Sequence, residues 1–315
     1  MKRIVAARLP PAAAGQTLLD YLSGRFAYHA REEWLQKIQN GELALNGEIS
    51  YDPAVKLNGN ELLEYFPTAL IEPDVRKDYQ IIFEDEYLLV INKPGNLPVH
   101  PAGPYFAHTL WALLADDNYG KVHFVNRLDR ETSGLLIAAK QPRIAGEINK
   151  TLPDMIKVYN VLVHGVFAQK CTASGYLVPD LASPIKKKQK FIAQSFDTEA
   201  PAPAGGMAVE TVFTPLQGNK AYTLLAAELR TGRMHQIRAT LHGMGFPVVG
   251  DKLYGLNEQF YRRLALDTLS EADRRQLLLP RQALHCCQLS FVHPVRKEVM
   301  TFTAELPPEI ADVLA

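Results

Sequence analysis

The feature that most constrains this chain is the stretch at 125–140, which reads VNRLDRETSGLLIAAK. Its second half, 135–139, is a short apolar run bounded by lysine, and such a run is typical of a buried strand. The polar residues before it therefore lie where a rigid element begins. We predict that Ser133 and Gly134 form a turn, with Gly134 in a backbone conformation closed to other residues. Asp129 would then be presented from a loop, and we interpret it as a candidate reacting group rather than an ordinary surface charge.

The same stretch resembles a known signature. The string RLD, two further residues, a Thr/Ser pair, glycine and an apolar run is similar to the signature loop of the RluA-type pseudouridine synthases. The resemblance implies that Asp129 is catalytic and that Arg127 enters the space left by an extruded nucleotide or grips a flanking phosphate. The chain departs from the family at Asn126, where histidine is usual. That histidine does not carry the chemistry, so we expect the change to affect loop hydrogen bonding or RNA contact rather than catalysis.

Length and composition indicate an ordinary globular protein with one large and one small domain. The chain has 315 residues, of which 47% are hydrophobic and 22% charged, and this excludes disordered, collagen-like and disulfide-stapled classes. No apolar run reaches the roughly 18 residues that a membrane-spanning helix needs. The basic amino-terminal residues precede only a short, proline-broken apolar part, which makes a poor signal peptide. We therefore expect a cytoplasmic protein.

Charge and cysteine content narrow the kinds of site. Lys plus Arg is 34 and Asp plus Glu is 34, so any RNA site must be a local basic patch. The densest basic run, at 186–190, is either a solvated face or a source of phosphate contacts. The three cysteines, Cys171, Cys286 and Cys287, lack zinc-site spacing and are expected to be reduced structural thiols. Residues 198–206 have few bulky apolar side chains and are expected to form an exposed loop.

Residues 1–70 have the pattern of a small separate module. A helix over 16–22, capped by Thr17, is predicted from its capping-box spacing, and a second over 31–40 from its apolar face. An Asn-Gly pair between alternating apolar residues predicts a hairpin over 43–49. Two short helices and a hairpin resemble the S-four-like RNA-binding module, first known from a small-subunit ribosomal protein, which commonly precedes this synthase family.

The charge of this module does not favour a strong grip on phosphates. Residues 1–75 contain seven Lys or Arg and ten Asp or Glu, a net charge of −3. Contact between RNA and residues such as Arg31 is therefore left open, the alternative being that the module supports the larger domain. The stretch at 71–79 is predicted to be a linker, and 80–315 the catalytic domain.

The first part of the larger domain carries a motif that is chiefly structural in the family. Two strands are predicted, at 81–83 and 87–91. They are followed by NKP and LPVHP, so Lys93 and His100 are expected to be scaffold residues rather than catalysts. A helix is predicted at 108–115, with Trp111 in the core rather than on a base-stacking surface.

Two further strings complete the resemblance. On a predicted strand over 155–163, the K-x-Y motif implies that Tyr159 packs against the target uracil, the alternative being a tyrosine in the core. The string TGR-x-HQIR implies that Arg238 lies against Asp129, which would keep the carboxylate ionised and oriented. Arg233 and His235 are expected to hold the loop or meet phosphate.

Together the motifs predict an α+β protein with the pseudouridine synthase fold: a mixed, mostly antiparallel sheet with flanking helices and a central cleft, plus a small α/β amino-terminal module. They imply isomerisation of uridine to pseudouridine in ribosomal or transfer RNA, with base flipping and without metal or cofactor. We expect a monomer that binds RNA and no membrane. One alternative is a non-catalytic RNA-binding or ribosome-assembly factor on the same fold. Another, a hydrolase using Ser133 or Asp129, lacks a recognisable nucleophile motif.

Overall fold

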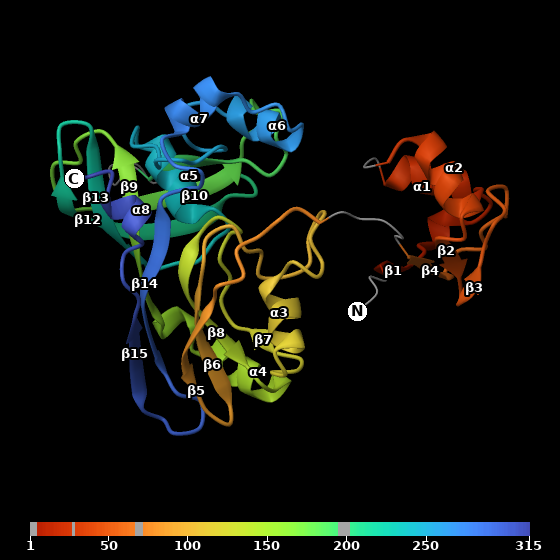
Figure 1. The fold of residues 1–315 in the computed structure, drawn as a ribbon, viewed down its shortest axis with the longest axis horizontal. Coiled ribbons are helices and arrows are strands. Elements are labelled where there is room, and N and C mark those ends of the chain that lie inside the picture. Colours follow the sequence, from red (N-terminus) through yellow and green to blue (C-terminus); the bar gives the residue numbers. More distant parts are fainter. Residues whose placement is uncertain (1–4, 27–28, 67–71, 195–201) are drawn as a thin grey trace. The chain divides into compact units, whose positions relative to one another are not determined.

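The computed structural model describes residues 5–26, 29–66, 72–194 and 202–315. The chain divides into two units, Met1–Pro73 and Asp74–Ala315, and each has its own hydrophobic core (Figure 1). Within the described residues, no helix is both long and apolar enough to traverse a bilayer. Residues 198–201 of the predicted exposed loop at 198–206, and residue 71 of the predicted linker at 71–79, lie outside the described residues.

The first unit packs two helices against a small antiparallel sheet with the strand order β1-β4-β2-β3. Its elements in chain order are β1 (Val5–Arg8), η1 (Pro11–Ala13), α1 (Leu18–Arg25), α2 (Arg31–Gln39), β2 (Leu43–Leu45), β3 (Glu48–Ile49) and β4 (Leu62–Tyr65). Both predicted helices and the hairpin are confirmed. The Thr17 side chain caps α1 by accepting the Asp20 N–H at 3.1 Å. Asn46 and Gly47 have φ of 53° and 85°, as a tight two-residue hairpin turn requires.

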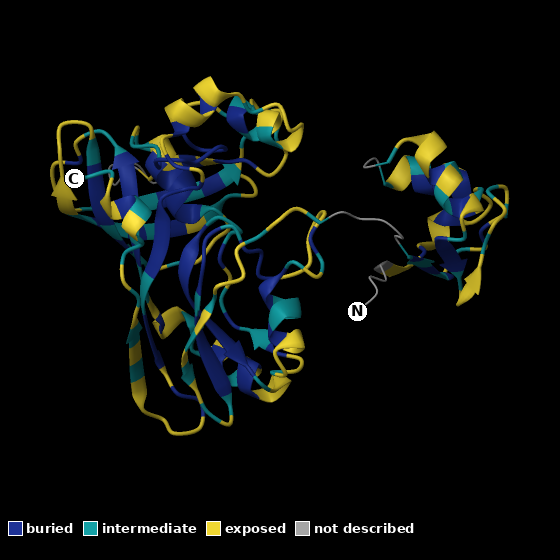
Figure 2. Ribbon diagram, viewed as in Figure 1, coloured by how far each residue is buried: buried dark blue, intermediate teal, exposed yellow. Residues whose placement is uncertain are grey.

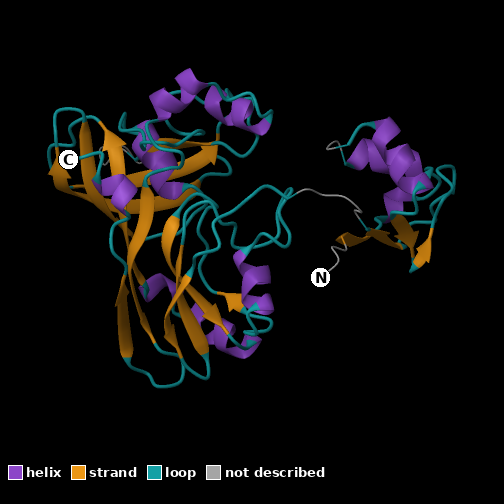
Figure 3. Ribbon diagram, in the orientation of Figure 1, coloured by secondary structure: helices purple, strands orange, loops and turns teal. Residues whose placement is uncertain are grey.

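The described residues of the second unit form one 11-stranded sheet with helices against it (Figure 3). Its elements are β5 (Gln80–Glu84), β6 (Leu88–Lys93), α3 (Leu110–Asp116), β7 (His123–Phe124), β8 (Ser133–Ala139), α4 (Pro142–Lys150), η2 (Leu152–Asp154), β9 (Ile156–His164), β10 (Cys171–Pro179), β11 (Gln189–Ala193), β12 (Met207–Gly218), β13 (Tyr222–Leu229), α5 (Gln236–Gly243), α6 (Gln259–Ala265), α7 (Glu271–Leu277), β14 (Leu284–Val292), β15 (Val299–Thr303) and α8 (Pro308–Ala311).

The main path of this sheet runs β11-β10-β12-β13-β9-β14-β8-β6-β5, with β15 added to β14 and β7 to β8. All pairs are antiparallel except β14 with β8, which is parallel. This is the predicted α+β arrangement with a mixed, mostly antiparallel sheet. Helix α4 packs against β7 and β8, and α5 packs against β10 and β11.

Strand β8 is the most deeply buried strand of the unit, and all seven of its residues are buried (Figure 2). The predicted buried strand is therefore confirmed, but the predicted turn at Ser133 and Gly134 is wrong, because both residues already belong to β8. The turn lies earlier, where the Thr132 N–H donates to the Asp129 carbonyl at 3.1 Å. Gly134 does have a positive φ, 108°. A Cβ there would lie 2.3 Å from the Cys286 carbonyl oxygen, so glycine serves the close approach of β14.

The strand register places distant parts of the chain side by side. Cys286 on β14 pairs with Gly134 on β8 and with Tyr159 on β9. The loop that carries Asp129 therefore enters the sheet next to β14 and two strands from β9, which carries Tyr159.

Helix α3 differs from its prediction in one respect, since Leu110 is buried but Trp111 is only half-buried. The Trp111 ring packs on the Phe106 ring, with the centroids 6.4 Å apart, rather than in the core.

Candidate active site

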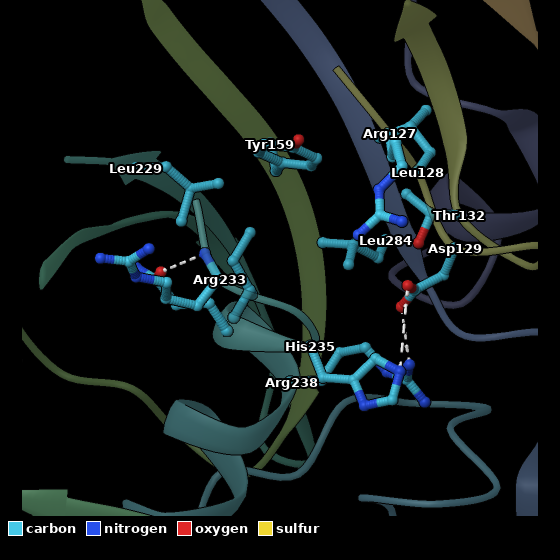
Figure 4. Close-up of a pocket in the computed structure, with 12 residues that line it drawn as sticks. Arg127, Leu128, Asp129, Thr132, Tyr159, Leu229, Arg233, His235, Arg238 and Leu284 are labelled. Atoms are coloured by element: carbon cyan, nitrogen blue, oxygen red, sulfur yellow. Dashed lines mark hydrogen bonds and ion pairs between the residues drawn. The ribbon is translucent and has the colours of Figure 1, made fainter. Parts of the chain in front are cut away.

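Asp129 lies in the loop before β8, and its two carboxylate oxygens have different surroundings. Oδ2 accepts hydrogen bonds from Arg238 Nη1 at 2.7 Å and from Gln282 Nε2 at 3.3 Å. Oδ1 has no hydrogen bond from any described residue, and His235 Nε2 lies 4.0 Å from it. The side chain is 32% exposed, so one oxygen is anchored and the other is open (Figure 4).

Arg238 on α5 joins two carboxylates. Besides Asp129, it contacts Asp251 through two hydrogen bonds, Nε to Oδ2 at 2.6 Å and Nη2 to Oδ1 at 2.8 Å. Asp251 Oδ1 also accepts the backbone N–H groups of Leu253 and Tyr254, both at 2.9 Å. The expected contact between Arg238 and Asp129 is thus present. Asp251, which belongs to the G-D-x-x-Y-G string after HQIR, fixes the plane of the guanidinium.

These contacts determine the ionisation of Asp129. Burial by itself would raise the pKa of Asp129, but the adjacent Arg238 charge and hydrogen bond hold it below its ordinary value. Burial would likewise lower the pKa of Arg238, and Asp251 and Asp129 raise it instead. At neutral pH the site therefore contains a carboxylate and a guanidinium in contact.

Backbone contacts fix the loop around Asp129. Lys93 is buried, and its Nζ donates to the carbonyl oxygens of Pro94 at 2.8 Å, Leu97 at 2.9 Å and Arg130 at 3.1 Å. Burial, together with the charge of Arg281, holds the pKa of Lys93 well below its ordinary value. These contacts fit the predicted scaffold role of Lys93, because its Nζ joins the loop after β6 to the loop that carries Asp129.

A second anchor follows Asp129 in the chain. Glu131 accepts from Lys252 Nζ at 2.9 Å, and its carbonyl oxygen accepts from Arg281 Nη1 at 3.3 Å. Arg281 in turn contacts Glu309 at the carboxyl end of the chain, Nη2 to Oε1 at 2.6 Å. Gln282 donates to Thr132 Oγ1 at 2.6 Å as well as to Asp129. No role is predicted for these residues from the sequence, since nothing in their local pattern signals the contacts.

Asn126, where the family usually has histidine, has a backbone partner in the structure. Its Oδ1 accepts the Ile137 N–H at 2.8 Å and its Nδ2 donates to the Leu135 carbonyl at 3.4 Å. Strand β7 pairs with β8 just before Asn126 in the chain. The Asn126 side chain extends this pairing, because its amide makes hydrogen bonds to the β8 backbone in place of further backbone groups. The departure therefore bears on loop hydrogen bonding, as expected.

A cavity of about 380 Å³ opens beside Asp129 (Figure 4). Part of this space is open to solvent. The cavity lies between the loop before β8, the strands β9, β13 and β14, and α5 with the loop before it. Its lining residues are Arg127, Leu128, Asp129, Thr132, Tyr159, Leu229, Arg233, His235, Gln236, Ile237, Arg238 and Leu284. Arg127, Asp129, Tyr159 and Arg238, the site residues predicted from the sequence, are among them.

Tyr159 and Arg127 present different surfaces to this cavity. Tyr159 is 6% exposed and lies on β9, so its ring is part of a rigid wall. Arg127 is exposed and makes no hydrogen bond or ion pair with another described residue, which leaves its guanidinium available to a ligand. Arg233 is also exposed.

His235 precedes α5 in a left-handed backbone conformation, with φ of 58°. Its Nδ1 lies 3.0 Å from the Tyr254 hydroxyl, which also accepts the Gln189 N–H at 2.9 Å. Burial, followed by the charge of Arg238, lowers the pKa of His235 to about 4, so the imidazole is neutral at pH 7.

The lysine run at 186–190 is not uniformly solvated. Lys188 is buried, with Nζ 2.8 Å from Glu258 Oε2 and 3.7 Å from Asp180 Oδ2, so a solvated face is the wrong description for this residue. Lys186 and Lys187 are exposed, and Lys187 Nζ lies over the Tyr261 ring at 4.4 Å. Within the described ranges, no three His, Cys, Asp or Glu side chains are grouped as metal ligands, and the three cysteines are free thiols.

Known proteins share both the sequence and the fold. The family described as RNA pseudouridylate synthase matches residues 87–243. Ribosomal large subunit pseudouridine synthase D of Buchnera aphidicola subsp. Baizongia pistaciae is 30% identical over 309 residues, covering 93% of this chain and 90% of that protein. The protein of the same name from Pseudomonas aeruginosa is 30% identical over 321 residues, covering 98% and 94%.

A solved structure supports the fold. Human RNA Pseudouridylate Synthase Domain Containing 4 superposes with a TM-score of 0.57 at 22% identity, covering 73% of this chain and 90% of that one. The family match favours an enzyme over the non-catalytic alternative. The chain therefore belongs to the RluA-type RNA pseudouridine synthases, a family of isomerases that act on RNA.

Proposed function

We propose that this protein converts specific uridines of large-subunit ribosomal RNA to pseudouridine and that Asp129 is the catalytic residue. The names of two relatives that align over nearly their whole length support this substrate. The observation that carries the catalytic role is the asymmetry of Asp129: Oδ2 is anchored by Arg238 and Gln282, while Oδ1 is open beside the cavity. An ionised carboxylate in that position can attack the ribose or the uracil ring, or take up a proton between steps.

The other lining residues receive roles that suit their exposure. Tyr159, on a rigid wall, packs against the target uracil. Arg238 keeps Asp129 ionised and oriented. Arg127 has no partner among the described residues, and it fills the space of the flipped nucleotide or grips a flanking phosphate. Flipping the base costs a few kcal/mol, and the cost is smallest where the RNA is already unpaired or strained.

The chain's organisation follows from the same proposal. Residues 80–315 form the catalytic domain, 71–79 the linker and 1–70 an S-four-like RNA-binding module. Two helices against a small sheet support that assignment of the module. Its contact with RNA is weak, because Arg31 pairs with Asp20 at 2.7 Å and Lys37 lies 3.4 Å from Glu42. The protein acts as a monomer in the cytoplasm.

The test is a map of pseudouridines in total RNA from a strain that lacks this gene, before and after complementation. We expect one or a few positions in large-subunit ribosomal RNA to lose pseudouridine. Wild-type protein restores them, and Asp129→Asn, expressed at the same level, does not. Loss confined to transfer RNA would overturn the proposed substrate, and restoration by Asp129→Asn would overturn the role of Asp129.

A further inference from the structure

His235 has a ring nitrogen directed at the open oxygen of Asp129. The two atoms, Nε2 and Oδ1, lie 4.0 Å apart, which is too far for a direct hydrogen bond. Both residues line the cavity, and Figure 4 shows the imidazole beside the carboxylate. Nε2 is thus placed to contact a ligand atom that also approaches Oδ1.

The contacts of the other ring nitrogen assign the tautomer. The Tyr254 hydroxyl oxygen accepts the Gln189 N–H, and the only other partner that the described residues provide for this hydroxyl is His235 Nδ1. Tyr254 is fully buried, so a hydroxyl hydrogen without an acceptor would be costly. The hydroxyl therefore donates to Nδ1, and the single hydrogen of the neutral imidazole is on Nε2, facing Asp129.

The backbone holds the ring in this position. A non-glycine residue with positive φ is uncommon, and it persists where the surroundings require it. His235 does not cap α5 with its side chain, so the conformation does not serve helix capping. Arg238 follows in the first turn of α5, which ties the imidazole and the guanidinium to one rigid element.

We propose that His235 is a further catalytic residue, whose Nε2–H donates a hydrogen bond to a carbonyl oxygen of the target uracil. This inference rests on the proposed role of Asp129. Whether the carboxylate attacks the ribose, releasing uracil with the bonding electrons, or adds to the ring, negative charge accumulates on the uracil carbonyl oxygens. A fixed donor near Oδ1 stabilises that charge. Nε2 keeps its hydrogen throughout, and no proton is transferred.

Two substitutions separate this role from a structural one. His235→Gln can place an amide N–H near the position of Nε2, whereas His235→Asn reaches only the position of Nδ1 but tolerates the left-handed backbone better. The assay is the single-turnover rate of pseudouridine formation, with enzyme in excess, on total RNA from a strain that lacks the gene. We expect His235→Asn to be slower by about 10²-fold and His235→Gln to stay within about 10-fold of wild type.

The two rates decide whether the Nε2–H of His235 takes part in the reaction. A fast His235→Asn, or equal rates for the two variants, would overturn the proposal. Separate measurement of ribosomal and small RNA fractions shows independently whether the proposed substrate is correct. A second measurement is made on the wild-type protein: ¹⁵N spectra of histidine-labelled protein at pH 7, in which the His235 signals are identified by their absence from the His235→Gln spectrum. The expected result is a neutral ring with hydrogen on Nε2, and hydrogen on Nδ1 or on both nitrogens would refute the assignment.

Discussion

Two clusters among the described residues of the second unit can be compared, each with an aspartate, a histidine and an arginine. In the cluster of Asp85, His293 and Arg296, the carboxylate is saturated: Oδ1 accepts the Tyr87 and Leu88 N–H groups at 2.8 and 2.9 Å, and Oδ2 accepts His293 Nε2 at 3.0 Å and Arg296 Nη2 at 3.1 Å. In the cluster of Asp129, His235 and Arg238, one oxygen is anchored and the other is open to a cavity.

The histidines differ in the same way. His293 Nδ1 accepts hydrogen bonds from two backbone N–H groups, those of Val295 at 3.2 Å and Arg296 at 3.0 Å. Its Nε2–H donates to Asp85. His235 uses Nδ1 for Tyr254 and has no hydrogen-bond partner for Nε2 among the described residues. The same residue types therefore stabilise the fold at Asp85, where the polar atoms are paired. At Asp129, where one atom of the carboxylate and one of the imidazole are unpaired, they form a candidate reactive site.

The comparison is tested most severely by removing charge from each aspartate in turn. Asp129→Asn should lower the rate of pseudouridine formation by at least about 10³-fold, measured with the protein fully folded. Asp85→Asn should keep the rate within about twofold and lower the free energy of unfolding by about 1–3 kcal/mol. Single-turnover assays and urea denaturation of both proteins make the measurement. A lower rate in Asp85→Asn under conditions where the variant is fully folded would show that Asp85 is not purely structural.

The arginines provide the next contrast. Arg238→Gln leaves Asp129 and Asp251 without their shared counter-charge, and we expect a loss of about 3–5 kcal/mol of stability. Arg296 is 45% exposed, so Arg296→Gln should cost less than about 1 kcal/mol.

The Arg238→Gln variant should also change the pH dependence of the rate. The pKa of Asp129 is held below its ordinary value in the wild type, and removing the guanidinium raises it. A carboxylate whose pKa is depressed by folding stabilises the protein above its unfolded pKa and loses that contribution as pH falls through the folded pKa. Activity of Arg238→Gln should therefore decline at a higher pH than wild type as the solution is acidified. Identical pH–rate profiles from pH 5 to 8 would contradict the assignment.

A smaller effect is expected at Gln282, which supplies the second hydrogen bond to Oδ2 of Asp129 and also holds Thr132. Gln282→Ala should slow the single-turnover step by about 10-fold, because the carboxylate keeps its ion pair but loses part of its orientation. Gln194→Ala, at an exposed position, is the matched control. Equal rates in the two variants would show that Arg238 alone orients Asp129.

The smallest effect concerns the exposed lysines. Lys187 is close enough to influence His235, and its substitution by alanine should weaken RNA binding a few-fold and reduce the magnitude of the salt slope by about one. Lys220 is exposed in the turn between β12 and β13, and Lys220→Ala should leave both unchanged. Filter binding of large-subunit ribosomal RNA across salt concentrations tests this, and equal slopes would place Lys187 outside the RNA contact.

Local patterns were sufficient for several parts of this molecule. The cap at Thr17, the Asn46-Gly47 turn and the buried run in β8 were predictable because each depends on residues a few positions apart. The four motif residues also came together, as the family resemblance implied. By contrast, the start of β8 was misplaced by the sequence pattern, because Gly134 serves its neighbour Cys286 and not a turn.

The sequence by itself thus indicated most of the elements and the family, and it pointed to Asp129 as the candidate carboxylate. Only the tertiary structure decided which oxygen of Asp129 is open, that Asp251 and Gln282 complete its surroundings, and that Lys188 is buried. The physical reason is distance along the chain: Gln282 and Asp129 are 153 residues apart, and they meet because β14 pairs in parallel with β8. Hydrogen bonds of that kind depend on strand register, which no local pattern of residues encodes.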